Sequence, residues 1–192
     1  LVKINQWTHW CLTRNSTNAK VYINGKLADT STSLGSATIY NSTEPLTIGA
    51  MKQSGSMTTS AQYEGFLDGL ALWTSEHSAN TVMEHYQKGR AGEFLTANSS
   101  CKLYIKADSY YGNTVFTDAS PSAHTITNVG EVYHHIDDNR TANTALYFDG
   151  YSFLRFPNIS KSNPYGRVRG QVSTPLCILG KSTDFSRLLV LS

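Results

Sequence analysis

The sequence has little charge, few cysteines and no long hydrophobic run. Charged residues make up 16% of the 192 residues, against about 25% in an average soluble protein. The formal net charge of +2 is too small for a nucleic-acid-binding surface, which needs a basic stripe. The longest purely aliphatic run, at residues 188–191, is far shorter than the roughly 20 residues that span a bilayer. Low charge combined with 11% aromatic residues also excludes ordinary disorder.

The chain lacks the common catalytic motifs. It contains no glycine-rich phosphate loop, nucleophile elbow or Cys-x-x-Cys pair. Glycoside hydrolysis needs two carboxyl groups about 5–9.5 Å apart. Glu64 and Asp68 are four residues apart on one expected strand, which separates them by about 13 Å. We therefore expect a non-catalytic protein that requires no cofactor.

What the sequence does contain is a series of short strands separated by turns, the pattern of an all-β sandwich. Asn24-Gly25 lies between two strand-like runs and predicts a type I′ hairpin. One helix is expected over residues 78–88, with Ser78 as N-cap and Gly89 as the C-terminal stop. The expected strands cover residues 2–14, 20–23, 37–40, 46–50, 66–73, 102–107, 115–118, 125–129, 145–156, 167–172, 176–179 and 185–191.

Two features point to an extracellular location. Five N-x-[ST] sequons lie in turn-like contexts, where a glycan could stand in water, at Asn15, Asn41, Asn98, Asn139 and Asn158. Clustering of Asn, Ser and Thr in turns is the alternative explanation. The three cysteines, Cys11, Cys101 and Cys177, fit no metal-binding spacing. They allow one disulfide and one free or intermolecular thiol, with all three pairings open.

The first part of the chain carries an ordered series of motifs: WTHWCLTRN, KVYINGK, LTIGA, YEGFLDGLALW and HSANTVMEHYQKG. This series resembles the C-terminal half of a laminin-G-like domain, which has a concanavalin-A-like jelly-roll fold. Gly69 and His77 depart from the pattern of that family. The resemblance covers residues 1–90.

Residues 101–192 resemble the N-terminal half of the same domain type, after a linker at 91–100. The motifs are KLYIKADS, TVFTDASPSAHTITNVGEV and TALYFDGYSFLRFP. The resemblance implies one antiparallel jelly-roll β-sandwich with its two halves in inverted order. Three explanations stay open: a circular permutant, a fold completed by a neighbouring subunit, or a unit cut from a tandem array.

The expected core follows from strand alternation and from the family pattern. On the first strand, Trp10 and Leu12 share the face expected to point inward, and His9 and Cys11 share the other. The expected core residues are Trp7, Trp10, Leu12, Phe66, Leu70, Trp73 and Phe148. Both chain ends are apolar and strand-like, which predicts assembly strands containing Val2, Ile4, Leu188, Leu189, Val190 and Leu191.

Relatives that bind calcium at the sandwich rim suggest acidic loop residues as ligands. Asp137 and Asp138 are the candidates, and a solvated turn is the alternative for them. Asp118 and Asp149 are weaker candidates. The six histidines are scattered along the sequence, which predicts structural or exposed roles. Aromatic side chains that could stack on sugar rings lie in expected loops at Tyr110, Tyr111, Tyr151 and Tyr165.

These observations predict a non-catalytic extracellular glycoprotein module that acts by surface contact. We expect a structural subunit of a self-assembling fibre, matrix or adhesive array, whose partners are copies of itself and its own N-linked glycans. The alternative is a lectin-like module that binds carbohydrate with the help of calcium. Neither hypothesis involves nucleic acid or a membrane span.

Overall fold

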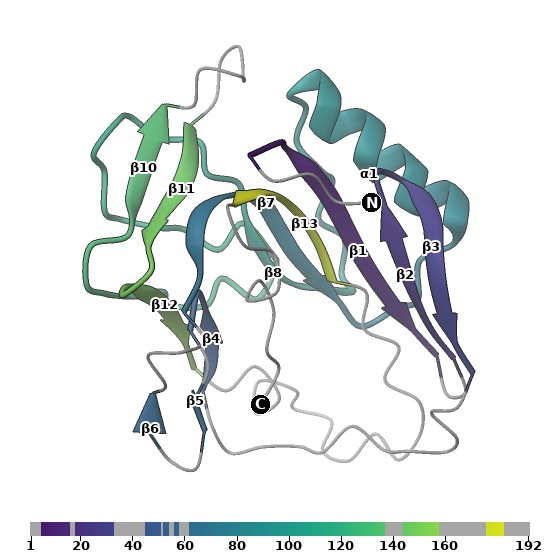
Figure 1. The fold of residues 1–192 in the computed structure, drawn as a ribbon, viewed down its shortest axis with the longest axis horizontal. Coiled ribbons are helices and arrows are strands. Elements are labelled where there is room, and N and C mark those ends of the chain that lie inside the picture. Colours follow the sequence, from purple (N-terminus) through teal and green to yellow (C-terminus); the bar gives the residue numbers. More distant parts are fainter. Residues whose placement is uncertain are drawn as a thin grey trace.

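The computed structural model describes residues 5–15, 18–32, 45–50, 52–53, 56–57, 62–136, 144–157 and 176–182. It contains one helix and thirteen strands in these ranges (Figure 1). The elements are β1 (Thr8–Arg14), β2 (Ala19–Ile23), β3 (Lys26–Ser31), β4 (Leu46–Ile48), β5 (Lys52–Gln53), β6 (Ser56–Met57), β7 (Glu64–Trp73), α1 (Ala79–Ala91), β8 (Cys101–Ile105), β9 (Thr127–Val129), β10 (Tyr133–Ile136), β11 (Thr144–Asp149), β12 (Phe153–Phe156) and β13 (Leu176–Ser182).

A large antiparallel sheet organises the molecule. Its strands run in the order β10-β11-β7-β13-β1-β2-β3. The long strand β7 pairs with β13 along one edge. Its other edge is shared, because β11 pairs with the N-terminal part of β7 and β8 pairs with the C-terminal part. A register shift in the β7–β13 pairing falls beside Gly69, whose φ of +60° gives the strand a bulge there.

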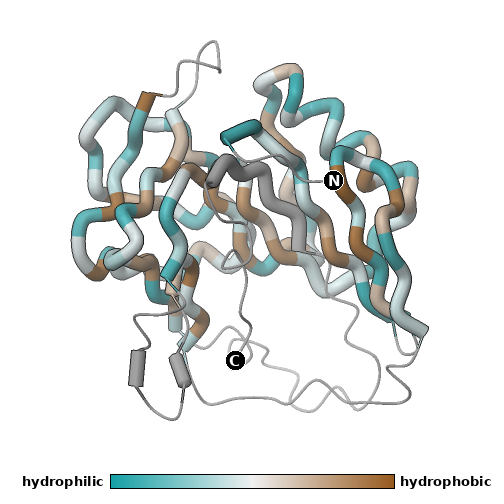
Figure 2. The backbone as a smooth tube through the Cα atoms, viewed as in Figure 1, coloured by the Kyte–Doolittle hydropathy of each residue, from teal (hydrophilic) through white to brown (hydrophobic). Residues whose placement is uncertain are grey.

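The first core lies between the large sheet and a smaller sheet, β4-β12-β9. Leu67, Leu70 and Leu146 from the large sheet pack with Leu154 and Phe156 from β12. Figure 2 shows hydrophobic residues along the strands of the large sheet and mainly hydrophilic ones along α1. Two packed antiparallel sheets confirm the expected all-β sandwich with one short helix.

The second core lies on the opposite face of the large sheet, beneath α1 and residues 93–100. Val82 of α1 is fully buried there among Cys11, Tyr22, Trp73 and Cys101. Leu95 and Ala97 pack against the same cluster. The segment expected to be a linker therefore covers part of the sheet.

The ends of α1 agree only partly with the expectation. Ser78 is the N-cap, and its Oγ accepts a hydrogen bond of 3.1 Å from the backbone N–H of Thr81. Gly89, however, lies inside the helix, which ends at Gly92 in the left-handed conformation with φ +71°. Both positions are glycine, but at Gly92 the N–H groups of Gly92 and Glu93 reach the last helical carbonyls, which stabilises the later stop.

The predicted hairpin is present. Asn24 and Gly25 have φ of +50° and +77° and join β2 to β3, as a type I′ turn requires. The expected strand at 115–118 is wrong, because these residues form no ladder. Instead, the N–H of Val115 donates to Asn113 Oδ1, and the carboxylate of Asp118 accepts hydrogen bonds from the N–H groups of Ser120 and His124, which organises the following loop.

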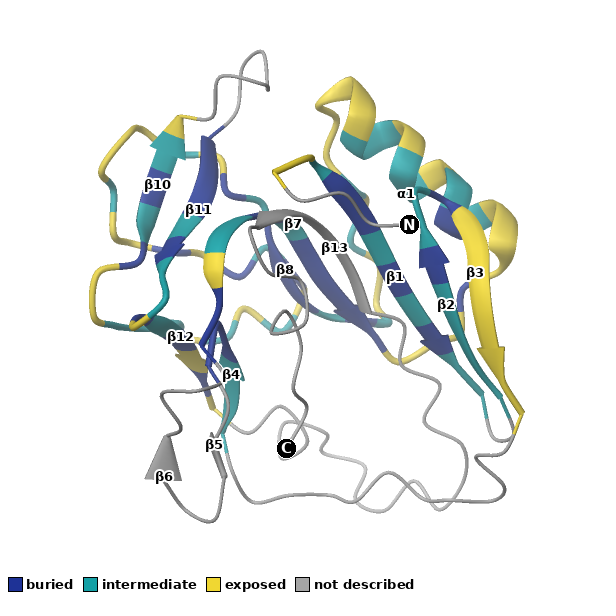
Figure 3. Ribbon diagram, in the orientation of Figure 1, coloured by how far each residue is buried: buried dark blue, intermediate teal, exposed yellow. Residues whose placement is uncertain are grey.

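Burial differs from the expected core at several positions. Leu70, Trp73 and Phe148 are buried, whereas Trp7, Trp10 and Leu12 are half-buried. Phe66 is also half-buried and points to the face opposite Leu67. On β1, His9, Cys11 and Thr13 are buried, because α1 covers their face of the sheet, which was expected to point outward (Figure 3).

Strands from both parts of the chain alternate in the large sheet. β13, from residues 101–192, lies between β1 and β7, from residues 1–90. β8 and β11 also pair with β7. In the described ranges the two parts therefore complete one sheet within a single chain.

Candidate functional site

A group of aromatic rings lies on one end of the large sheet, on the face that α1 covers elsewhere. We call Phe66, Tyr111, Tyr133, His135 and Tyr147 the aromatic patch. The ring centroids of Tyr133 and Tyr147 are 5.3 Å apart, and those of Tyr147 and Phe66 are 5.2 Å apart. His135 lies 5.2 Å from Phe66 and 5.4 Å from Tyr111.

Strand register explains how the patch forms. Tyr133 of β10 lies opposite Tyr147 of β11, which lies opposite Phe66 of β7. Directly paired residues point to the same face of a sheet, so the three rings make a row across three strands. The next row pairs His135 with Ala145. Ala145 is fully buried and has only a methyl side chain, so the imidazole of His135 has room to lie against Phe66.

Tyr111 is brought to the patch by a loop that is tied to β10 and β11. The N–H of Gly112 donates to the carbonyl of His134 at 2.8 Å, and the N–H of His134 donates to Asn113 at 2.9 Å. Thr144 Oγ1 donates to the carbonyl of Ala107. Tyr111 thereby stands beside β10 with 58% of its surface exposed.

The buried side chain of His134 holds the same loop in place. Its ring stacks on Phe116 at 5.1 Å. Nδ1 lies 3.2 Å from Thr144 Oγ1, and Nε2 lies 3.3 Å from the carbonyl of Val115. Burial lowers the pKa of His134, which favours the neutral ring in this position.

Carboxylates surround the row of tyrosines. Glu64 lies directly opposite Asp149 at the end of β7 and β11. Burial, with Tyr111, Tyr147, Asp149 and Glu131 nearby, raises the pKa of Tyr133. Burial also acts to raise the pKa of Asp149, but hydrogen bonds from Tyr151 and Ser152 outweigh it and hold that pKa low.

The patch can offer stacking faces and hydrogen bonds together. Its rings are partly exposed and pack in tilted or T-shaped pairs, and nearby Tyr110 is 74% exposed. Phenol hydroxyls donate and accept hydrogen bonds, and ionised carboxylates accept them. Such a surface suits a ligand that has a flat apolar side and polar groups at its rim.

The acidic residues named from the sequence have structural roles where the structure describes them. Asp118 is buried and accepts hydrogen bonds from the N–H groups of Tyr104, Ser120 and His124. Asp149 Oδ1 accepts from the N–H groups of Tyr151 and Ser152. Asp137 and Asp138 lie outside the described residues. Within the described ranges, no group of three or more His, Cys, Asp or Glu side chains could hold a metal ion.

Two of the five sequons are described. Asn98 is exposed, and its Oδ1 accepts hydrogen bonds from the backbone N–H and the hydroxyl of Ser100. Asn15 is half-buried, and its Nδ2 donates to Glu76 Oε1 at 3.3 Å. Asn41, Asn139 and Asn158 lie outside the described residues, as do Tyr165 and the expected assembly residues Val2, Ile4, Leu188, Leu189, Val190 and Leu191.

The cysteines have different environments. Cys11 is disulfide-bonded, and its Cα lies opposite that of Cys177 in the β1–β13 register. Cys101 is a buried free thiol. Burial raises the pKa of the Cys101 thiol to about 11, so it is neutral and unreactive in the folded protein.

Sequence reasoning named Tyr111 but missed the rest of the patch. Tyr133 and His135 are two residues apart on one strand, so alternation alone places them on one face. The missing information was the register that sets Tyr147 and Phe66 beside them. Two histidines on either side of the first helical turns also come together, since His77, before α1, and His85, within it, both contact Trp73.

Comparison with known proteins supports the resemblance seen in the first part of the chain. Residues 1–83 match the family model described as the concanavalin A-like lectin/glucanases superfamily. No curated protein and no solved structure matches the chain. The predicted resemblance to this superfamily is therefore confirmed over residues 1–83. The match ends before residue 101, so the inverted order of the two halves stays a prediction. No helix in the described part is long and apolar enough to cross a membrane.

Proposed function

We propose that this chain, whose residues 1–83 match the model of the concanavalin A-like lectin/glucanases superfamily, is a non-catalytic extracellular module that binds carbohydrate through the aromatic patch. The observation that carries the proposal is the row formed by Tyr133, Tyr147 and Phe66 across β10, β11 and β7. These rings are partly exposed, and clustered aromatic surface on a soluble protein marks an interaction site.

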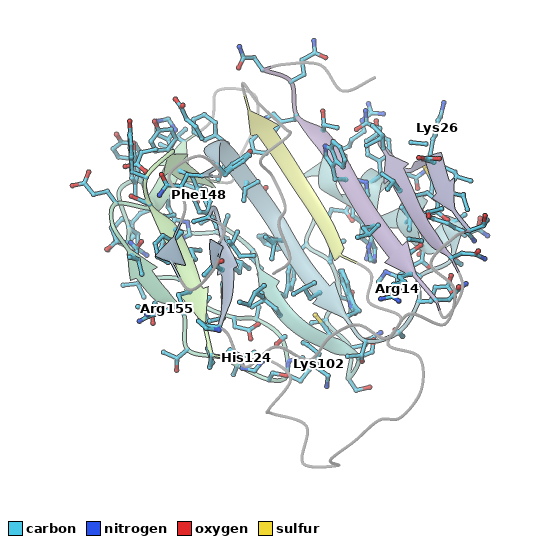
Figure 4. The ribbon with its side chains drawn as sticks, turned by 60° about the horizontal axis from the view of Figure 1, so that its bottom comes forward. Arg14, Lys26, Lys102, His124, Phe148 and Arg155 are labelled. Carbon is cyan, nitrogen blue, oxygen red and sulfur yellow. The ribbon has the colours of Figure 1, made fainter. Side chains whose placement is uncertain are left out.

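A sugar ring fits this surface better than a nucleobase does. The C–H face of a pyranose is apolar and can lie on aromatic rings, while its hydroxyls can reach tyrosine hydroxyls and the carboxylates of Glu64 and Asp149. Nucleic acid would need basic side chains along its phosphates. Arg14, Lys26, Lys102 and Arg155 are instead spread over distant parts of the molecule (Figure 4).

Two observations support an extracellular location. Disulfides form and persist in oxidising compartments, and Cys11 is disulfide-bonded. The sequon at Asn98 is exposed in a loop, where a glycan meets no packed surface.

Self-assembly is the second candidate function, and the edge strand β3 favours it. β3 ends the large sheet, and all six of its residues are exposed (Figure 3). An exposed edge can accept a strand from another copy. Completion by a neighbour is not required in the described part of the sheet, because β13 pairs with β1 and β7 of its own chain. Sedimentation across a wide protein concentration range tests this candidate, which a persistent monomer would exclude.

Carbohydrate binding is tested on a glycan array with the purified chain. We expect Tyr147→Ala to weaken binding to any glycan that the unmodified chain selects by at least about fivefold, taking for the apolar face of a sugar the contribution of about 1–3 kcal/mol that a nucleobase makes when it stacks on an aromatic side chain. Tyr147→Phe keeps the ring and should retain most of the binding. Leu27→Ala is the control, because Leu27 is 54% exposed on β3, at the opposite edge of the large sheet from β10.

A repeat of the array with a chelator shows whether calcium takes part. Loss of binding with the chelator would support the calcium-assisted form of the hypothesis. An array with no selected glycan, or a Tyr147→Ala variant that binds like the unmodified chain, would overturn the proposal.

A further inference from the structure

Three histidines from three different elements meet between α1 and the large sheet. His9 lies on β1, His77 lies just before α1, and His85 lies on α1. The ring centroids of His77 and His85 are 4.9 Å apart, and each ring also contacts Trp73, at 4.6 and 5.0 Å. His9 packs against Tyr86 of α1 at 5.8 Å. Imidazole rings therefore make up part of the contact between α1 and the sheet.

His9 and His77 are buried and His85 is half-buried, and each has at least one buried ring nitrogen without a hydrogen-bond partner among the described residues. His9 is only 4% exposed, and neither of its ring nitrogens has a hydrogen-bond partner in the part of the chain that the structure describes. Nδ1 of His77 and Nδ1 of His85 are also buried without a partner. A buried charge that is not paired is strongly unfavourable, so the packing requires neutral rings.

The charged groups around the cluster add to this requirement. From α1, Lys88 lies close enough to lower the pKa of His85, and Arg90 lies over the ring of Tyr86 at 5.8 Å. Glu76, before the helix, accepts a hydrogen bond from Asn15. Asp68 of β7 is buried on the face of His9, two strands away in the register. The acidic side chain on α1 itself, Glu84, is exposed.

We propose that His9, His77 and His85 form an acid-operated release for α1: neutral imidazoles hold the helix on the sheet, and their protonation in mildly acidic solution drives it away. Opening would hydrate all three rings and separate His85 from the other two. It would expose the face of β1 and β7 that packs against Val82, including Trp73 of β7. This inference does not depend on the carbohydrate proposal.

The direction of the effect follows from linkage. Burial lowers the pKa of His9 to about 4, and burial together with His77, His9 and Lys88 lowers that of His85 to about 4. Burial also lowers the pKa of His77. Because the closed-state values lie below the ordinary value of about 6.5, the closed form is fully favoured above that pH and loses stability as the pH falls towards 4. At pH 5, His9 alone shifts the equilibrium towards opening by roughly 30-fold.

Cys101 provides a reporter for this opening. Its side chain is fully buried in the same cluster as Val82 of α1 and Trp73 of β7. A reagent that reacts with thiols in acid, such as 4,4′-dithiodipyridine, should label Cys101 only when the cover leaves. Peptide mass mapping identifies the labelled residue. The rate at each pH is divided by that of the chain unfolded in urea, which removes the intrinsic pH dependence of the reaction.

We expect the corrected labelling rate of Cys101 to rise at least about 30-fold between pH 7 and pH 5. His85→Gln should reduce the rise, and the double variant His9→Leu/His85→Met should flatten it to within about threefold. His124→Gln is the control, since His124 belongs to a loop away from α1. Hydrogen exchange of β11 and β12 amides should stay slow at pH 5, because the first core remains closed.

Several results would overturn the proposal. One is a corrected rate that does not change with pH in the unmodified chain. Another is a double variant that keeps the full pH dependence. A third is exchange of β11 in step with Cys101, which would mean global unfolding. If the double variant does not fold, NMR titration of the unmodified chain decides, since imidazoles of His9 and His85 that titrate near pH 6.5 while α1 stays closed would contradict the mechanism.

Discussion

Replacing Asp118 with alanine should lower the free energy of unfolding by about 3–5 kcal/mol. The side chain is 5% exposed. Its Oδ1 accepts hydrogen bonds from the N–H groups of Tyr104 and Ser120, both at 2.9 Å. Its Oδ2 accepts from the Ser120 hydroxyl at 3.0 Å and from the N–H of His124 at 2.8 Å. One carboxylate thus holds β8 to the loop that follows residue 118.

The magnitude follows from the groups that alanine would leave without an acceptor. The N–H groups of Tyr104 and Ser120 are buried at this point, and each would lose its partner at about 1–3 kcal/mol. The N–H of His124 is only partly buried and can turn to water, so it adds less. Most of the loss should therefore come from two backbone groups.

Two further variants divide this energy. Asp118→Asn keeps one oxygen for Tyr104 and Ser120 but places an amide group opposite the N–H of His124, so we expect a loss of about 1–2 kcal/mol. Ser120→Ala removes the hydroxyl bond and should cost about 1 kcal/mol. The expected order of destabilisation is Asp118→Ala, then Asp118→Asn, then Ser120→Ala.

Urea unfolding followed by tryptophan fluorescence, without reductant, measures all three values. Equal m-values would show that the unfolded states are comparable. The reasoning is refuted if Asp118→Ala costs less than about 1 kcal/mol, or if Asp118→Asn costs as much as Asp118→Ala. Either result would mean that the backbone N–H groups find other acceptors or water.

The remaining predictions concern the backbone and covalent modification. Gly49→Ala should lower the free energy of unfolding by about 2–4 kcal/mol, because a Cβ there would lie 2.6 Å from the ring of Phe148 and φ is +95°. Gly112→Ala, with φ +82° and nothing within 4 Å of the added Cβ, should lower it by only about 1 kcal/mol through the backbone. Equal losses for the two variants in urea unfolding would contradict the clash. Peptide mapping of the secreted chain without reductant should find a glycan on Asn98 and a Cys11–Cys177 link, and an unmodified Asn98 or a Cys101-containing link would count against this assignment.

Local signals in the sequence predicted local structure well. Asn24-Gly25 specified a hairpin because its turn requires positive φ at both positions. Ser78 specified the start of α1 because its hydroxyl can satisfy an exposed N–H. The end of the helix was predicted at Gly89 instead of Gly92, because glycine at either position can adopt the left-handed conformation. Only the surrounding carbonyls and N–H groups distinguish them.

Contacts between distant segments were predicted less well, for a physical reason. Alternation along β1 separates Trp10 from His9, but it does not reveal that α1 covers the His9 face. Phe66 was expected in the core from strand alternation and the family pattern. Its half-exposed position depends on its pairing with Tyr147, which is a long-range register that sequence periodicity does not determine.

The two proposals meet on one face of the large sheet. The part that contains His9, Ala71 and Trp73 is covered by α1 and by residues 93–100. The part that contains Phe66, Tyr147 and Tyr133 carries rings that cover Ala145 but remain partly exposed themselves. The bulge at Gly69 falls between Phe66 and Ala71 on β7 and keeps both on this face, although five residues would otherwise place them on opposite faces. Release of α1 would therefore expose more aromatic surface along the same strand, next to the aromatic patch. Glycan affinity measured at pH 5 and at pH 7 would show whether the helix limits the surface that is open to a glycan.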